Sequence, residues 1–449
     1  MNSNHVAMTS PKAPQPSAEM HSKKTVSIDK TFSTAHPNVP STEDVVLDAM
    51  RRRLSQAGRS ESEPFCVMDL GKVQSQYERW QSSLRFVQPC YAVKCNPDSK
   101  VIALLDSLGS NFDCASQAEI ELVMQQGIPP WRIIFANPCK KPSDIAFARD
   151  SMVLRMTFDN EAELRKIKRI CPSAELILRC YASDPSATYT LASKFGAHPE
   201  EAVKLLKLAK SLGLEVCGVS FHVGSGSKDP RAFERAIQES RRVVDAGIHL
   251  GHNMYIVDIG GGFTSDTFDA AAVRIRASLS THFSAMNIRF LAEPGRFFVA
   301  DAVTVACGVI GRRDAHENPT TLDGPVNDML YLNDGMYGTF LTYFFELCPQ
   351  PKALRVSGAF YPQSTAAESS KYILWGPTCD GLDCILKDAE LPKDLSCDDW
   401  IYFSDMGAYT TCLTTNFNGF TSQREIIYVF SRTSETTPRK CAEVEDVWH

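Results

Sequence analysis

Short apolar runs alternate with amphipathic stretches through the middle of the chain. Apolar residues recur at helical spacing in stretches such as Ser116–Gln126 and Pro199–Ser211, and strand-like runs lie between such stretches. Eight strands alternating with helices over roughly 200 residues predict a (β/α)₈ TIM-type barrel within residues 70–303. A doubly wound sheet is the alternative, but the near-regular spacing and the lack of a nucleotide-binding fingerprint disfavour it. The predicted strands are Cys90–Lys94, Asn111–Ala115, Ile133–Asn137, Val153–Phe158, Leu176–Cys180, Gly218–Val223, Tyr255–Ile259 and Arg289–Glu293.

The pattern changes after Val303, where short β-rich runs replace the helical periods. Turns rich in Gly, Pro and Asp separate these runs. A further strand at Phe65–Leu70 precedes the barrel, and a helix is expected over Val45–Leu54. We therefore predict a second, mainly β domain formed by residues 41–69 and 304–431. Its later strands are predicted at Met329–Leu332, Tyr372–Trp375, Trp400–Phe403 and Glu425–Phe430.

The two ends of the chain contain few large apolar residues. Residues 1–40 are rich in Ser, Pro, Thr and Lys, so they have too little apolar surface to offset the entropy of ordering. We predict a disordered tail over residues 1–40 and a loose polar tail over residues 432–449.

Composition and charge exclude several classes of protein. The 449 residues carry a formal net charge of -6, which gives no electrostatic reason to expect a nucleic-acid partner. No apolar stretch reaches membrane-spanning length, and the N-terminal segment lacks the apolar core of a signal peptide. It has no arginine before Arg51 and carries Glu19 and Asp29, unlike a mitochondrial transit peptide. The fifteen cysteines include no C-x-x-C pair, so we expect reduced thiols in the cytoplasm and no metal site.

Polar, ionisable or glycine-rich residues end most of the predicted strands, where functional groups gather in a barrel. Lys94 closes the apolar run Tyr91–Val93, and no carboxylate nearby in the sequence neutralises it. Desolvation would lower the pKa of this amine and make it a nucleophile toward carbonyls. For Lys94 taken alone, a strand-end lysine that reaches solvent is the simpler interpretation.

Glycines and an arginine after the last two predicted strands suggest a phosphate site. The triplet Gly260–Gly262 lets backbone amides approach an anion, and Arg296 adds a fork of donors. A nucleophilic lysine, a phosphate site and the strand-end Glu293 together predict pyridoxal phosphate, whose ring acts as an electron sink. The alternatives are a tight turn for the glycines, a rim ion pair for Glu293 and a core position for His222.

Nine motifs, spread in order over about residues 40–430, closely resemble those of the eukaryotic ornithine decarboxylases. They are PCYAVKCN, NFDCAS, IIFANPCK, SFHVGSGS, DIGGGF, AEPGRF, NDGMYG, WGPTCDGLD and MGAYT. That family comprises barrel-plus-β-domain decarboxylases of basic amino acids that use pyridoxal phosphate. The resemblance implies the same fold and activity, and a homodimer whose active sites are shared between its subunits.

The resemblance also implies a role for each matching residue. Lys94 would bond covalently to the cofactor, His222 would stack on its ring, and Glu293 would pair with the pyridine nitrogen. Cys379 of the second subunit would protonate the carbanion, and Asp380 would hold the distal amine of the substrate. Without the resemblance, the glycines and proline around these two residues predict only a rigid turn. The other matching positions are Ser225, Gly260, Gly261, Gly262, Arg296 and Tyr409 around the cofactor and its phosphate, Asp113, Glu119 and Arg179 in the active site, and Lys194 with Asp383 as an ion pair across the dimer interface.

The chain departs from the family pattern within Tyr343–Pro349. Glu346 stands where ornithine decarboxylases carry an aspartate that shares the distal amine, and Leu347 replaces the following histidine. The extra methylene moves the carboxylate in a site that measures substrate length, so we predict altered specificity. Lysine, or a bulkier N-substituted diamino acid of a loline-type alkaloid pathway, is then an alternative to ornithine and polyamine biosynthesis. Drift in a tolerant loop is the disfavoured alternative.

Two other interpretations are open but disfavoured. An inactive regulator resembling antizyme inhibitor would have lost cofactor contacts, yet Lys94, Asp113, Arg179, Arg296 and Tyr409 are all present. Diaminopimelate and arginine decarboxylases share the barrel motifs, whereas GPTCDGLD favours the ornithine branch. Binding of an antizyme partner is compatible with the sequence and untested by it.

Overall fold

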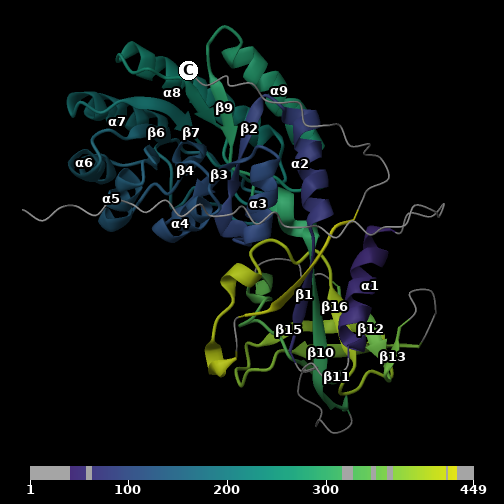
Figure 1. Ribbon diagram of the computed structural model, residues 1–449. Helices are drawn as coiled ribbons and strands as arrows, with labels where there is room; N and C mark the ends of the chain where they lie inside the picture. Colours follow the sequence, from purple (N-terminus) through teal and green to yellow (C-terminus); the bar gives the residue numbers. More distant parts are fainter. Residues whose placement is uncertain are drawn as a thin grey trace, which may run out of the picture. The chain divides into compact units, whose positions relative to one another are not determined.

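The computed structural model describes residues 41–56, 63–315, 327–344, 350–361, 368–420 and 423–431 (Figure 1). All of these described residues belong to one compact unit. The tails predicted at residues 1–40 and 432–449 lie outside the described residues. Glu346 and Leu347 also lie outside them.

Eight parallel strands close into a barrel, as predicted. Neighbours along the chain are neighbours in the sheet, and the last strand closes against the first, where Phe290 pairs with Val87. The strands are β2 (Val87–Ala92), β3 (Asn111–Cys114), β4 (Ile133–Phe135), β5 (Arg155–Phe158), β6 (Glu175–Arg179), β7 (Val216–Ser220), β8 (Ile256–Asp258) and β9 (Arg289–Ala292).

Amphipathic helices lie outside the barrel strands (Figure 1). Polar caps begin several of them; for example, the Ser116 side chain accepts a hydrogen bond from the Glu119 N–H at the start of α4. Among the described helices, none is long and apolar enough to cross a membrane. These helices are α2 (Leu70–Leu84), α3 (Ser99–Ser107), α4 (Gln117–Gln125), α5 (Pro142–Asp150), α6 (Glu161–Ile170), α7 (Pro199–Ser211), α8 (Arg231–His249) and α9 (Phe268–Phe283).

Side chains fill the inside of the barrel. Cys90, Ile134 and Ile177 belong to a small buried cluster of their own, whereas their neighbours Tyr91 and Phe135 belong to the large cluster that includes the helices. This alternation follows from the period of two along a strand. Because the interior is packed, a binding site must lie at one end of the barrel.

A mixed sheet follows the barrel and includes a strand that precedes it. The strand predicted at Phe65–Leu70 is β1 (Phe65–Asp69), which pairs with β10 (Val303–Arg313) and β17 (Glu425–Val429). Helix α1 (Thr42–Ser55) packs its apolar face on this sheet, where Met50 and Leu54 are buried. The remaining strands are β11 (Asp328–Leu332), β12 (Lys352–Val356), β13 (Ala359–Phe360), β14 (Ser369–Trp375), β15 (Cys384–Pro392) and β16 (Trp400–Phe403).

Most of the predicted barrel strands end one to three residues later than the observed strands, and for two of them the difference moves a predicted site residue out of the strand. Strand β2 ends at Ala92, and Lys94 lies in the 3₁₀ turn Val93–Cys95. Strand β7 ends at Ser220, so His222 belongs to the loop that follows. In both places the apolar sequence continues past the last residue that pairs with a neighbouring strand. Both residues still lie at the carboxyl end of the barrel.

Candidate active site

The carboxyl ends of the barrel strands surround a pocket of about 600 Å³. Most of the residues predicted to bind the cofactor meet here, and Tyr409 joins them from the segment after β16. A smaller adjoining cavity adds Gly262 to the same surroundings. The predicted residues that line the main pocket are Lys94, Arg179, Lys194, His222, Ser225, Glu293, Arg296 and Tyr409.

Lys94 forms a close ion pair with Asp113, which lies on the neighbouring strand β3. The Asp113 side chain is fully buried, whereas the Lys94 side chain is 42% exposed at the pocket. Burial alone would lower the pKa of Lys94, but the charges of Asp113, Tyr409 and Glu293 raise it above its ordinary value. The predicted lowering of this pKa is therefore wrong. The neutralising carboxylate comes 19 residues later in the sequence, and only the strand pairing brings it close.

A second carboxylate lies beside this pair. Glu119 accepts a hydrogen bond from the Ala115 N–H at 2.7 Å. Burial raises the pKa of Glu119, and the charge of Asp113 adds to the effect. The other oxygen of Asp113, Oδ1, is buried without a hydrogen-bond partner among the described residues. The carboxylates therefore concentrate negative charge next to the Lys94 amine.

Two further buried carboxyl groups lie at the ends of β8 and β9. Asp258 is the last residue of β8, and its Oδ1 accepts a hydrogen bond from the Gly260 N–H at 2.8 Å. Burial raises the pKa of Asp258 to about 7. Burial, then the charges of Asp258 and Asp113, raise the pKa of Glu293 well above its ordinary value. The two groups hold a proton at a higher pH than exposed carboxylates do. We had not predicted Asp258 as a site residue, although the DIGGGF motif places it at a strand end.

His222 presents a neutral imidazole to the pocket. Its Nδ1 accepts a hydrogen bond from the Gly224 N–H at 3.0 Å. Burial, then the positive charges of Arg179 and Lys94, lower the pKa of His222 well below its ordinary value. A Cβ placed on Gly261 would lie 2.8 Å from His222 Nε2, so the ring borders the glycine loop. A flat, uncharged ring in this place suits stacking on a planar ligand.

The glycine loop and Arg296 form an anion-binding arrangement. Gly260 and Gly262 have φ values of 65° and 107°, and a Cβ on Gly262 would lie 2.4 Å from the Gly224 carbonyl oxygen. Only glycine fits such a close approach. An Arg296 Nη2 donates a hydrogen bond to Ser225 Oγ at 3.5 Å, and the guanidinium lies 5.2 Å from the centre of the Tyr409 ring. A guanidinium, a hydroxyl and a glycine-rich backbone are the donors that a phosphate group requires.

This set of groups fits pyridoxal phosphate. Lys94 supplies an amine for the carbonyl group of the cofactor, and Glu293 supplies a carboxyl group for its pyridine nitrogen. His222 supplies a flat ring on which the pyridine ring can stack. Arg296 and Ser225 supply donors for the phosphate. All five residues border the same small cavity.

Apolar and aromatic side chains complete the lining of the main pocket. Tyr189, Leu191 and Phe195 come from the segment between β6 and α7, and Leu341 and Leu413 come from after the barrel. We had not predicted these residues as site residues, because the segments that carry them have no helical or strand period. Their composition gives this part of the pocket a largely apolar surface.

Cys379 and Asp380 lie outside this pocket, on the turn between β14 and β15. Cys379 is exposed, and its N–H donates to Asn418 Oδ1 at 3.0 Å. The Asp380 carboxylate accepts a short hydrogen bond from the Tyr337 hydroxyl. The turn therefore presents a thiol and a carboxylate at the surface of the chain.

Asp383 stabilises this turn through hydrogen bonds. Its buried carboxylate accepts hydrogen bonds from the N–H groups of Met336 at 2.7 Å and Thr378 at 2.8 Å. A Cβ on Gly376 would come within 2.2 Å of the same carboxylate. These contacts give Asp383 a structural role within its own chain, and an ion pair with Lys194 of a second subunit stays a prediction.

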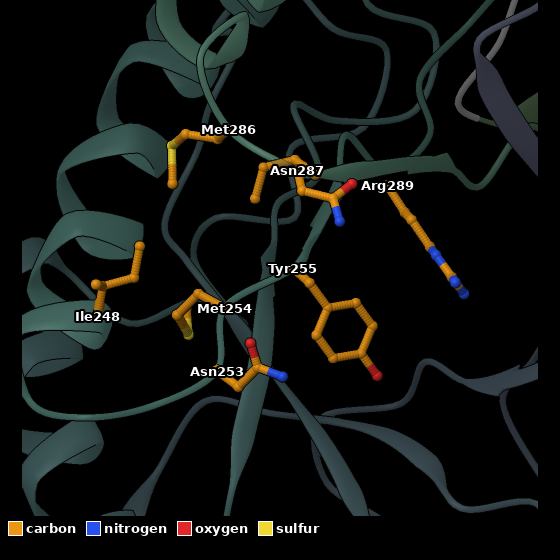
Figure 2. Close-up of a pocket in the computed structure, with 8 residues that line it drawn as sticks. Ile248, Asn253, Met254, Tyr255, Met286, Asn287 and Arg289 are labelled. Carbon is orange, nitrogen blue, oxygen red and sulfur yellow. The ribbon is translucent and has the colours of Figure 1, made fainter. Parts of the chain in front are cut away.

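A second pocket, of about 450 Å³, lies at the other end of the barrel (Figure 2). It is lined by Ile248 at the end of α8, by Tyr255 just before β8 and by Arg289 at the start of β9. None of its lining residues was predicted to act in catalysis. Conserved function in such barrels gathers at the opposite, carboxyl ends of the strands. The pocket around Lys94 is therefore the candidate active site.

Known proteins match the chain over most of its length. A family model described as the pyridoxal-binding domain of pyridoxal-dependent decarboxylases matches residues 70–300. Decarboxylase flvG of Aspergillus flavus is 58% identical over 393 residues, which cover 87% of this chain and 92% of that protein. The ornithine decarboxylase of Neurospora crassa is 43% identical over 415 residues, 86% of each chain. The arginine decarboxylase of Paramecium bursaria Chlorella virus, solved with agmatine bound, has a TM-score of 0.78 at 38% identity and covers 85% of this chain and 100% of its own.

Proposed function

This chain belongs to the pyridoxal-dependent decarboxylases of basic amino acids, and from that premise we propose that it decarboxylates a basic L-amino acid, with a substrate pocket altered from that of the ornithine decarboxylases. The observation that carries the proposal is the meeting of Lys94, Glu293 and Arg296 in one pocket whose remaining lining is largely apolar. Pyridoxal phosphate, when bound, would serve as the sink for the electron pair that departing CO₂ leaves on the α-carbon of the substrate. The protein has to hold that group, orient the substrate and move protons.

Lys94 is the residue placed to hold the cofactor covalently. Its Nζ must lose a proton before it acts as a nucleophile, and the Asp113 carboxylate in contact with it fixes the position of the amine. The acid pair of Glu293 and Asp258 can supply and retain a proton for the pyridine nitrogen. His222, being neutral, supports the ring without adding a competing positive charge.

The phosphate end is held by donors that do not titrate near neutral pH. Arg296 stays charged, Ser225 Oγ lies beside it, and the loop around Gly261 and Gly262 brings the backbone close. Tyr409, whose ring lies beneath the guanidinium, fixes the direction of the Arg296 side chain.

We propose that the active site is completed by a second copy of the chain. Cys379 is exposed and Asp380 lies on the same turn, yet neither lines the pocket around Lys94 of its own chain. In a homodimer these residues of the second copy would enter the site, Cys379 to return a proton to the α-carbon and Asp380 to bind a distal ammonium group. A cationic side chain on the substrate follows from this carboxylate.

The most specific part of the proposal concerns the identity of the substrate. The resemblance to ornithine decarboxylases implies that Glu346 stands at the position that meets the distal amine, and the described lining of the pocket adds Leu341, Leu413 and Leu191. A longer carboxylate and an apolar wall favour a side chain unlike that of ornithine, such as that of lysine or of an N-substituted diamino acid used in alkaloid biosynthesis. A polyamine role in the cytoplasm is the alternative.

Product analysis by mass spectrometry tests the proposal. The cofactor-loaded protein is incubated separately with L-ornithine, L-lysine and L-arginine, and the visible absorption of the bound cofactor is recorded in parallel. We expect an intact absorption band and little putrescine from ornithine. Efficient conversion of ornithine to putrescine would contradict the altered specificity, and a protein that binds the cofactor and releases no amine from any basic amino acid would contradict the activity.

A further inference from the structure

Asp184 is a buried carboxylate with no role in the function proposed above. It lies in residues 181–198, which we call the wall segment, and is 1% exposed. Its Oδ1 accepts hydrogen bonds from the N–H and the hydroxyl of Ser186, at 2.8 and 2.6 Å. Its Oδ2 accepts hydrogen bonds from Ser227 Oγ at 2.8 Å and from the N–H groups of Lys228 and Asp229 at 2.9 Å. Five donors from two loops therefore meet on one carboxylate.

The donors keep this carboxylate charged. Burial alone would raise the pKa of Asp184, but its hydrogen bonds lower it well below the ordinary value. Three of the five donors belong to residues 223–229, which we call the cradle loop. Asp184 is thus a fixed anionic link between the wall segment and the cradle loop.

The two segments also pair directly along their backbones. Tyr189 and Ser225 exchange two hydrogen bonds, at 3.1 and 2.9 Å, as an isolated antiparallel bridge. A Cβ on Gly224 would lie 2.8 Å from the Ala187 Cβ, and a Cβ on Gly226 would lie 2.7 Å from Thr188 Oγ1. The segments therefore touch so closely that neither can move far without the other.

Each segment contributes to a different part of the pocket. The wall segment supplies Tyr189, Leu191 and Phe195 to the surface that faces the substrate. The cradle loop supplies Ser225, whose hydroxyl accepts from Arg296 in the anion-binding arrangement. A ligand that orders one segment will, through the shared contacts, order the other.

We propose that Asp184 is a positioning residue that couples the phosphate site to the substrate wall, so that a bound phosphate group orders the wall segment. The inference rests on the proposed function in one respect: it takes the bound phosphate group to be that of the cofactor. Asn has nearly the same shape as Asp but only one acceptor oxygen. In an Asp184→Asn variant the side chain loses its charge, so its hydrogen bonds to the cradle loop weaken whichever way the amide turns, and the NH₂ group faces N–H or O–H donors on one side.

Binding affinity tests the cradle side of the link. We expect D184N to weaken the binding of pyridoxal phosphate about tenfold, the loss associated with one hydrogen bond to a charged group. The binding of pyridoxal, which lacks the phosphate, should change much less. Asp159→Asn is the matched control, because Asp159 Oδ2 accepts from the Gly196 N–H at 2.9 Å and anchors the far end of the wall segment without touching the cradle loop. This variant should bind pyridoxal phosphate like the wild-type chain.

Hydrogen–deuterium exchange tests the wall side of the link without any turnover. Saturating pyridoxal phosphate should slow exchange at residues 186–190 in the wild-type chain and in D159N, but not in D184N. The coupling would be overturned if pyridoxal phosphate slowed exchange at residues 186–190 as much in D184N as in the wild-type chain. It would also be overturned if D184N lost as much affinity for pyridoxal as for pyridoxal phosphate. If D184N does not fold, Ser227→Ala decides in its place, because it removes a single donor and should give a smaller effect in the same direction. A failure of the proposed decarboxylation leaves both readouts intact.

Discussion

The ammonium of Lys94 and the carboxylate of Asp113 illustrate how two opposing effects set the state of a single residue. Desolvation favours the neutral amine, whereas a fully buried carboxylate in contact with it favours the charged one. The second effect outweighs the first, so the pKa of Lys94 lies above its ordinary value. A hydropathy pattern shows only the burial, so it predicted the wrong direction for this pKa.

Removing the Lys94 amine tests its assignment directly. In Lys94→Ala we expect the visible absorption band of protein-bound cofactor and the turnover to be lost together, because no covalent link can form. Absorbance spectra and amine release after incubation with cofactor measure the two effects. Lys194→Ala is the control, since Lys194 is an exposed lysine that lines the same pocket. It should keep the band, and turnover of K94A at the wild-type rate would refute the assignment.

The acid pair at the ends of β8 and β9 predicts a pH-dependent stability. Asp258 has an ordinary pKa of 3.8 and a folded value of about 7, so the folded chain holds a proton that the unfolded chain has released. Stability from this group is therefore present at low pH and falls as the pH rises from about 4 to about 7. In Asp258→Asn that loss disappears, and we expect the variant to gain stability relative to wild type as the pH rises, by up to a few kcal/mol.

Thermal unfolding of the cofactor-free protein at pH 5 and pH 7.5 measures this difference. Asn keeps an oxygen that can accept from the Gly260 N–H, so the loop itself should remain intact. Asp106→Asn serves as a control, because Asp106 forms a partly exposed ion pair with Arg132 at some distance from the acid pair. A difference in stability between D258N and wild type that does not change with pH would contradict a proton held by Asp258 and Glu293 in the folded chain.

At the scale of elements, the eight barrel strands follow from the chain's periodicity, whereas the places where they end do not. Strands buried on both faces read as continuous apolar runs, and amphipathic helices separate them. A strand ends where its last backbone hydrogen bond to the neighbouring strand ends. For this reason β2 ends at Ala92 and not at Lys94. The wall residues Tyr189 and Leu191 were missed for a similar reason. Asp184 and the cradle loop, which follows the next barrel strand, hold them in place through contacts that no local period shows.

The glycine loop after β8 yields a prediction about an element. In Gly262→Ala the added Cβ would meet the Gly224 carbonyl oxygen at 2.4 Å in a left-handed backbone conformation. The loop has to move, so we expect affinity for pyridoxal phosphate to fall by about tenfold or more. Gly127→Ala is a matched control with φ of 84° and no described atom within 4 Å of its Cβ. It should cost about 1 kcal/mol of stability from backbone strain and leave cofactor affinity unchanged. Equal affinities of the two variants for pyridoxal phosphate would contradict a role of the glycine loop in binding the phosphate group.

At the scale of the whole molecule, the barrel alone does not make the site. The Tyr409 N–H donates to the Cys95 carbonyl beside Lys94 at 2.9 Å, and the Asn96 side chain donates to the Gly407 carbonyl at 2.9 Å. The Tyr428 hydroxyl donates to Asp98 at 2.6 Å, on the residue that caps α3. The segments after β16 thus hold the turn that carries Lys94. The sequence motifs predicted Tyr409 through the family resemblance only, since nothing in local hydropathy links residues 95 and 409.

The proposed sharing of active sites between two copies of the chain gives the last prediction. If Asp380 of one chain serves Lys94 of another, a Lys94→Ala chain and an Asp380→Ala chain are each inactive alone. A mixed dimer then has one site with both substitutions and one site with neither. Random mixing should restore about a quarter of wild-type activity, because half of the dimers are mixed and each of those has one intact site.

The measurement is amine release by the separately purified variants before and after mixing, with the substrate identified by product analysis. Mixing K94A with a Lys94→Ala/Asp380→Ala double variant is the matched control, because no pairing of those chains yields an intact site. Restoration in the first mixture alone would mean that the exposed turn between β14 and β15 acts in the pocket of a second copy. No restoration in either mixture would mean that Asp380 acts within its own chain, or that its contact with Tyr337 serves only to hold the turn.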